Sequence, residues 1–296
     1  MPDKLLINTG MSPAGWSSFS AFLRCERLFY YTSGRRAAEA TQQATLAPDF
    51  ALLRGSLGHV GLAHHYARQG MAQAGLDPEI YYEPIEAMKL VAAGYPPKLG
   101  SGEKTSDVLD IAIEMVVSYR AHYEGERLQV VAVEAPVSFL LPPGPDGVVR
   151  EVTQRLDLVI RDDAGKVHLC DHKLSAELSK KSLMARYSLS TQFLLMQLVG
   201  QRLHGRDFGG CLVNIVGAHT DRTPQQRFYR FPPEAAPAAL RELPDVIAGT
   251  LATIAHRRAS GGGGPAAWRP AFHEEVCFGS YGGRCVYYER CKWGNL

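Results

Sequence analysis

The chain has 296 residues, of which 46% are hydrophobic and 21% charged, a composition typical of a globular protein with a substantial core. Its net charge of only +2 excludes a basic surface spread over the whole molecule, so any phosphate-binding surface must be local. The absence of an apolar run of about 18 residues and of a signal peptide predicts a cytoplasmic protein with no membrane partner.

The first half of the chain is predicted to be helical. Apolar residues at helical spacing indicate a helix over 17–31, a second over 50–69 and an amphipathic third over 105–124. Residues 71–104 mix glycine, proline and tyrosine, which predicts an irregular or partly helical insertion.

The second half of the chain changes to strand-like sequence. Three strands are predicted over 129–141, 148–160 and 166–173, separated by turn sequences, and a helix over 187–203 follows them. The last predicted elements are strands over 208–216 and 226–231 and a helix over 233–258 that is broken or kinked near Pro244. This order predicts an α/β fold in which a helical region precedes a sheet.

Two acidic residues and a lysine lie on neighbouring predicted strands. Asp157 is in one strand and Asp171-His172-Lys173 ends the next, so a hairpin would bring them together. Residues two apart share a face of a strand, so Asp171 and Lys173 should point one way and His172 the other. Carboxylates suit Mg²⁺ or Mn²⁺, and a lysine can hold or deprotonate a water or neutralise charge on a phosphate. The alternative is a surface hairpin with a polar end.

Three cysteines near the end of the chain form a second group. Cys277, Cys285 and Cys291 have glycines between them, which lets a backbone wrap closely around a metal. In a cytoplasmic protein we expect metal ligands or thiols rather than disulfides. Cys25 is the best candidate for a fourth ligand, because the two other cysteines lie in apolar strand sequence and should be core residues. The spacing leaves an iron–sulfur cluster, a structural Zn²⁺ and unconnected thiols open.

Several separated motifs along the chain resemble those of one protein family. Residues 17–31 resemble its opening S-x-x-x-F-x-x-C-P-R-x-F-x-Y pattern, with Glu26 where proline is usual. Residues 55–59 match its G-x-x-x-H motif, and residues 134–137 resemble the glutamate-bearing strand before its active site.

The core and tail motifs complete the resemblance. Residues 155–157 with 171–173 resemble the metal-binding core, and residues 277–291 resemble the cysteine tail of phage-associated members. The chain thus resembles the RecB-like branch of the PD-(D/E)XK nuclease superfamily. Within that branch it resembles iron–sulfur exonucleases such as the AddB nuclease domain and the four-cysteine CRISPR-associated exonucleases.

This resemblance implies a restriction-endonuclease-like core, in which helices flank a central mixed sheet, with a helical N-terminal region and a cysteine-ligated C-terminal tail. We expect residues 1–128 to form the helical region, 129–259 the nuclease core and 260–296 the glycine linker and cysteine segment, all packed as one domain.

The resemblance also implies roles for individual residues. His59, Asp157 and Asp171 would ligate Mg²⁺ or Mn²⁺, with the carbonyl of His172 as an additional ligand, and Lys173 would be the catalytic lysine.

Two further positions belong to the implied site. Glu134 would either aid the metal site or pair with a basic neighbour. Gln192 matches the first position of the family's Q-x-x-x-Y helix motif, which helps to fix the substrate or the active site, but Met196 stands where the tyrosine should be. Tyr187 cannot occupy the same helical position, so it is not assigned the missing role.

The implied cluster is a [4Fe–4S] centre held by Cys25, Cys277, Cys285 and Cys291, with structural Zn²⁺ as the alternative. The gap between Cys277 and Cys285 is wider than in the family's best-known members, so the type of cluster is less firmly implied than its presence.

The implied activity is that of a Mg²⁺- or Mn²⁺-dependent deoxyribonuclease, expected to be an exonuclease on DNA ends or single strands in recombination, repair or phage- or CRISPR-related processing. No Walker-type motif is present, so unwinding would need a helicase; a recombinase or CRISPR adaptation complex is the other implied partner. A homo-oligomer is left open, and a phage-encoded protein would act in the host cytoplasm. The alternatives are a catalytically weak DNA-binding or assembly module with the nuclease fold, and a zinc-clamped α/β protein unrelated to nucleic acid.

Overall fold

The computed structural model describes residues 4–9, 15–30, 50–100, 102–126, 128–176, 179–187, 190–218, 226–234, 236–260 and 268. The described residues fall into two compact units, the first within 1–10, 46–137 and 155–240 and the second within 11–45, 138–154 and 241–296. The three consecutive segments expected from the sequence stay a prediction. None of the helices in the described part of the chain is long and apolar enough to cross a bilayer.

The first unit begins with a layer of helices. These are α3 (Phe50–Gln73), α4 (Pro84–Ala92) and α5 (Thr105–His122), with a short 3-10 helix, η3 (Pro78–Ile80), after the first. The insertion expected over 71–104 is therefore partly helical, as predicted. The helices pack closely because α3 has a glycine at the contact: a Cβ on Gly61 would lie 2.6 Å from the sulfur of Met88.

A five-stranded mixed sheet follows. Its strands, in spatial order, are β1 (Gln129–Leu140), β2 (Glu151–Arg161), β3 (Val167–Ser175), β4 (Phe208–Ala218) and β5 (Gln226–Phe231). β2 and β3 form an antiparallel hairpin, β3 and β4 are parallel, and β4 and β5 are antiparallel. The parallel pair needs a crossover, which is supplied by α6 (Lys180–Tyr187), α7 (Thr191–His204) and the short η4 (Gly205–Asp207).

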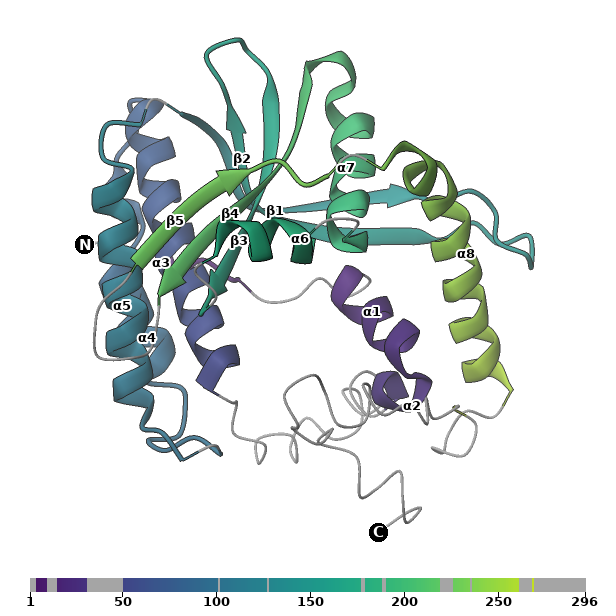
Figure 1. Cartoon of the computed structure of the whole chain (residues 1–296), viewed down its shortest axis with the longest axis horizontal. Helices are drawn as coiled ribbons and strands as arrows, with labels where there is room; N and C mark the ends of the chain where they lie inside the picture. Colours follow the sequence, from purple (N-terminus) through teal and green to yellow (C-terminus); the bar gives the residue numbers. More distant parts are fainter. Residues whose placement is uncertain are drawn as a thin grey trace. The chain divides into compact units, whose positions relative to one another are not determined.

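Helices lie against the sheet, as Figure 1 shows for the first unit, with α3 and α5 beside β3 to β5 and α7 over the strands that it connects. The main core joins α3, α4 and α5 to strand residues such as Leu158, Ile160 and Cys170. The expected fold class, a mixed sheet flanked by helices with a helical N-terminal region, is therefore confirmed.

Three expected helices differ from prediction. The helix expected over 17–31 is divided into α1 (Trp16–Arg24) and α2 (Glu26–Phe29), because Cys25 between them is extended. The helix expected over 187–203 begins only at Thr191, after α6 has ended.

The third difference concerns the helix at the end of the described chain. α8 (Pro237–Ala259) continues through Pro244, so of the expected break or kink the break is wrong. Leu243 and Ile247 are buried on either side of the proline, and this burial offsets the backbone hydrogen bond that proline cannot make.

A chain of buried polar groups crosses the core of the first unit. The Tyr119 hydroxyl lies 2.6 Å from that of Tyr66 and accepts hydrogen bonds from Asn214 Nδ2 (2.8 Å) and Arg230 Nη2 (3.0 Å). The same Asn214 amide lies 2.6 Å from Nδ1 of the buried His172. Asn214 therefore links the two tyrosine hydroxyls to His172 on β3, the strand that carries Asp171 and Lys173.

Replacing Asn214 by leucine should destabilise the protein by about 2–4 kcal/mol, because Tyr119 and His172 would keep buried polar atoms without this partner. Urea unfolding measures the change, with Gln201→Leu on the exposed side of α7 as the control. A loss within about 0.5 kcal/mol of that control, the usual size for a surface change, would show that the network adds little stability.

Candidate functional site

The β2–β3 hairpin brings the acidic residues together. Its register pairs Leu158 with Cys170, which sets Asp157 and Asp171 at neighbouring positions on adjacent strands. Asp157 Oδ2 also accepts a hydrogen bond of 2.9 Å from the backbone N–H of His172. The expectation that two adjacent strands carry the acids is confirmed.

His59 reaches this hairpin from α3. A Cβ on Gly58 would lie 1.9 Å from a methyl carbon of Leu174 on β3, so only glycine lets the helix approach the strand this closely. The approach leaves His59 Nδ1 at 3.4 Å from Asp157 Oδ2. Gly58, the residue before the motif histidine, thus has a packing reason for its presence, whereas a Cβ on Gly55, the first residue of the G-x-x-x-H motif, would meet nothing within 4 Å.

Glu134 joins the same group from β1. It is the only non-glycine residue of the described chain with a positive φ, at 49°, a conformation that costs about 1–3 kcal/mol and is concentrated at functional sites. One ligand atom each of His59, Glu134 and Asp157 lie within 4.8 Å of one another. Both interpretations of Glu134 stay predictions: this geometry puts it in a group that could hold a metal, and the positive charge of Arg155 acts to lower its pKa.

The charge state of this group fits a divalent cation. Burial, and then the negative charge of Asp157, raise the pKa of Glu134 to about 8. Burial also raises the pKa of Asp157 to about 6, with His59 opposing the rise and Asp171 adding to it. The buried carboxylate of Glu134 and the half-buried one of Asp157 disfavour ionisation beside one another, and with an imidazole nitrogen they form an oxygen-rich donor set suited to Mg²⁺ or Mn²⁺.

Asp171 and Lys173 form a second cluster with Gln192 of α7. Lys173 Nζ lies 2.6 Å from Asp171 Oδ2 and donates to Gln192 Oε1 at 2.9 Å, while Gln192 Nε2 donates to Asp171 Oδ1 at 2.5 Å. Burial lowers the pKa of Lys173, but the carboxylates of Asp171 and Asp157 outweigh burial and leave that pKa above its usual value. Lys173 is therefore a protonated hydrogen-bond donor at neutral pH in the metal-free protein.

His172 points to the opposite face of the sheet, as the strand period predicts. Its ring stacks on Tyr66 with centroids 5.7 Å apart and planes at 8°. Burial lowers the pKa of His172 well below its usual value, so the ring is neutral. The side chain is thus a core group, and only the backbone of His172 faces the acidic residues.

The Q-x-x-x-Y motif, which the chain matches at Gln192 but not at Met196, lies on α7. Met196 is buried in α7, where it packs as a core residue. The Tyr187 ring packs edge-on against Phe193, and the charge of Lys173 lowers the pKa of the Tyr187 phenol against a larger rise from burial, so the phenol lies near the lysine. Helical spacing from Gln192 could not have predicted that Tyr187 lies near Lys173, because Tyr187 is the last residue of α6 and α7 begins only at Thr191.

The cysteines divide as expected where the structure describes them. Cys170 and Cys211 are buried in strands, so their assignment to the core is confirmed. Cys25 is half-buried at the bend between α1 and α2. Cys277, Cys285 and Cys291 lie outside the described residues.

With the geometry established, comparison with known families is decisive. The family model of the PD-(D/E)XK nuclease superfamily matches residues 14–292. The chain belongs to the PD-(D/E)XK nuclease superfamily. The matched range includes Asp157, Asp171 and Lys173, the hairpin residues that the motif resemblance assigns to the core motif.

Comparisons with individual proteins are weaker. A structure from Eubacterium rectale, named as a candidate exonuclease, has a TM-score of 0.42 and 13% identity over 92% of this chain and 87% of its own. The structure of SSO0001 has a TM-score of 0.26 and 16% identity. The match covers 47% of this chain and only 60% of the length of SSO0001. No curated protein matches the sequence.

Proposed function

We propose that this member of the superfamily is a metal-dependent deoxyribonuclease that hydrolyses phosphodiester bonds with Mg²⁺ or Mn²⁺. The observation that carries the proposal is the convergence of His59, Glu134 and Asp157 within 4.8 Å, beside the Lys173–Asp171 ion pair. Family membership supports DNA as the substrate.

When bound, Mg²⁺ or Mn²⁺ would supply Lewis-acid chemistry, namely polarisation of the scissile phosphate and a lower pKa for the attacking water. His59, Glu134 and Asp157 would hold the ion, with Asp171 and the carbonyl of His172 as further ligands. The ammonium of Lys173 would donate to the attacked phosphate and stabilise the negative charge that develops there. Gln192 bonds to both Asp171 and Lys173 and so keeps the carboxylate and the ammonium in a fixed relation.

The finer proposal is an exonuclease of the RecB-like branch that acts on DNA ends or single strands. The order of the motifs from residue 17 to residue 291 supports it. The test uses linear and circular single-stranded DNA of one sequence with Mn²⁺, and EDTA as the metal-free control. Release of nucleotides from the linear form alone supports an exonuclease, whereas nicking of the circle would show an endonuclease. The unwound DNA would come from a helicase, a recombinase or a CRISPR adaptation complex.

The cysteine proposal concerns a [4Fe–4S] cluster, or Zn²⁺, held by Cys25, Cys277, Cys285 and Cys291. Such a centre would join two distant parts of the sequence and restrain the unfolded chain. Cys25→Ala should remove the metal and lower stability by several kcal/mol, because metal-binding energy is folding energy.

Anaerobic purification, iron, sulfide and zinc analysis and thermal unfolding measure this effect. Cys211→Ala serves as the matched control, because this cysteine is buried in a strand and should lose stability without losing metal. Unchanged metal content and melting in Cys25→Ala would remove this cysteine from the proposed centre.

A further inference from the structure

A pocket of the first unit lies directly beside the metal-ligand group. It is bounded by α3, β1, β2 and the N-terminal segment 4–9. Its lining includes Ile7, Tyr81, Val131, Val133, Glu134 and Arg155. Since Glu134 also belongs to the metal-ligand group, whatever occupies the pocket is adjacent to the reacting centre.

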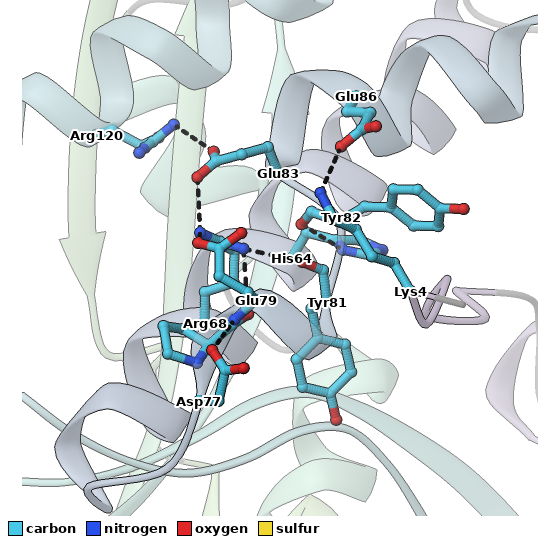
Figure 2. A network of polar contacts seen from close by, with 11 residues as sticks. Lys4, His64, Arg68, Asp77, Glu79, Tyr81, Tyr82, Glu83, Glu86 and Arg120 are labelled. Carbon is cyan, nitrogen blue, oxygen red and sulfur yellow. Dashed lines mark hydrogen bonds and ion pairs between the residues drawn. The ribbon is translucent and has the colours of Figure 1, made fainter. Parts of the chain in front are cut away.

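The wall of the pocket that carries Tyr81 is fixed by the protein itself. Arg68 Nη1 donates to the carbonyls of Pro78 (3.1 Å) and Tyr81 (2.9 Å), and its other nitrogen pairs with Glu83 at 2.9 Å. Figure 2 shows this network, with the ring of Tyr81 directed away from the ion pairs. The hydrogen bond from Arg68 therefore fixes the backbone of Tyr81, while the Tyr81 ring lines the pocket.

The N-terminal segment is held to the same wall. The buried His64 accepts a hydrogen bond from the Ile7 backbone N–H at 3.1 Å through Nε2, and its Nδ1 lies 3.0 Å from the Tyr82 carbonyl. Leu5 adds a backbone bond of 2.8 Å to Ile80. These bonds set the position of Ile7, so this side of the pocket is formed before any ligand arrives.

Arg155 provides the pocket with positive charge. It is the only cation among the described residues that line the pocket. It lies two positions from Asp157 on the same face of β2, a separation of about 7 Å along the strand. Its Nη1 donates to the Asn8 carbonyl, while its Nε is buried and has no hydrogen-bond partner among the described residues. The guanidinium is therefore held in place with part of its hydrogen-bonding capacity unused.

We propose that this pocket binds the unpaired deoxynucleotide next to the scissile phosphate, with Arg155 pairing with the phosphate of that nucleotide and Tyr81 receiving its base. The proposal rests on the proposed nuclease function and names the part of the substrate that the enzyme holds. A guanidinium pairs well with phosphate, and an aromatic ring beside apolar walls accepts a base regardless of its identity. Val131 and Val133 supply such apolar surface here.

The test is a substrate scan that replaces one phosphodiester at a time by a neutral methylphosphonate in single-stranded DNA. For the unmutated protein, one position flanking the cleaved bond should lower the cleavage rate at least tenfold. Arg155→Gln should lower the rate on unmodified DNA by a similar factor and show no further loss at that position. Arg161→Gln is the matched control, because Arg161 shares the strand and face but bonds to the Gly165 carbonyl at the hairpin turn.

A binding arm separates this inference from the proposed function. Affinity for the same oligonucleotides is measured by fluorescence anisotropy with Ca²⁺, and Tyr81→Leu is tested against an abasic nucleotide at the sensitive position. We expect at least tenfold weaker binding for Arg155→Gln, and equal binding of normal and abasic DNA by Tyr81→Leu. Unchanged binding by both variants overturns the subsite. Absence of Mn²⁺-dependent cleavage by the unmutated protein overturns the nuclease function, while the binding results still decide the subsite.

Discussion

Lys173→Ala is expected to lower Mn²⁺-dependent DNA hydrolysis by about 10³-fold, the loss typical for a donor that stabilises charge in a transition state. The ammonium is held by Asp171 and Gln192 at 2.6 and 2.9 Å, beside the carboxylates that would bind the metal. Single-turnover cleavage of end-labelled DNA measures the rate, and circular dichroism checks the fold. Asp171→Asn should cause a comparable loss, because it removes the partner of the lysine and an expected metal ligand.

The matched control is Lys166→Ala. This lysine belongs to the same hairpin, but its Nζ donates to the Arg206 carbonyl at 2.7 Å, and we expect unchanged cleavage. Full activity in both Lys173→Ala and Asp171→Asn would reject the assignment of the catalytic site. A loss in all three variants would instead indicate damage to the hairpin.

The metal-free protein is expected to lose stability as the pH rises from about 4.5 to about 8. The pKa of Glu134 is about 8 in the folded protein against an ordinary value of 4.5, so the folded state binds more protons in this range. Stability falls with pH wherever the folded state binds the extra proton. A difference of one in pKa corresponds to about 1.4 kcal/mol, so the total loss is on the order of 5 kcal/mol. Asp157, with a pKa of about 6, contributes to the lower part of the same range.

Urea unfolding with EDTA at a series of pH values measures this dependence. Mn²⁺ should stabilise the protein more at pH 8 than at pH 5.5, because its carboxylate ligands must lose their protons. Glu134→Gln should flatten the metal-free profile and reduce the effect of Mn²⁺, whereas Glu124→Gln, at an exposed position after the end of α5, should change neither. A flat profile for the unmutated metal-free protein would contradict the charge state described for the site.

The hairpin and its acids could be predicted from the sequence because the controlling rules are local. The two-residue period of a strand was enough to separate His172 from Asp171 and Lys173. The turn sequence before Lys166 was enough to place Asp157 on the adjacent strand. His59 was found through the G-x-x-x-H motif that begins at Gly55, and the structure adds a packing role for Gly58, whose missing side chain lets α3 meet Leu174.

The boundaries of several elements could not be predicted, because burial competes with local preference. Pro244 is a helix breaker by its own chemistry, yet α8 continues through it between the buried Leu243 and Ile247. Conversely, helical spacing around Cys25 predicted one helix where the chain makes two, since the cysteine adopts an extended conformation.

The superfamily motifs, the mixed α/β order and the acids and lysine of one hairpin could thus be predicted from the residues alone. The packed fold was needed to show that Glu134 turns toward His59 and Asp157, that Asn214 joins His172 to Tyr119, and that Arg155 lines a pocket beside the acids. These contacts join residues far apart in the chain, so their geometry depends on how closely the helices and strands pack rather than on any local period.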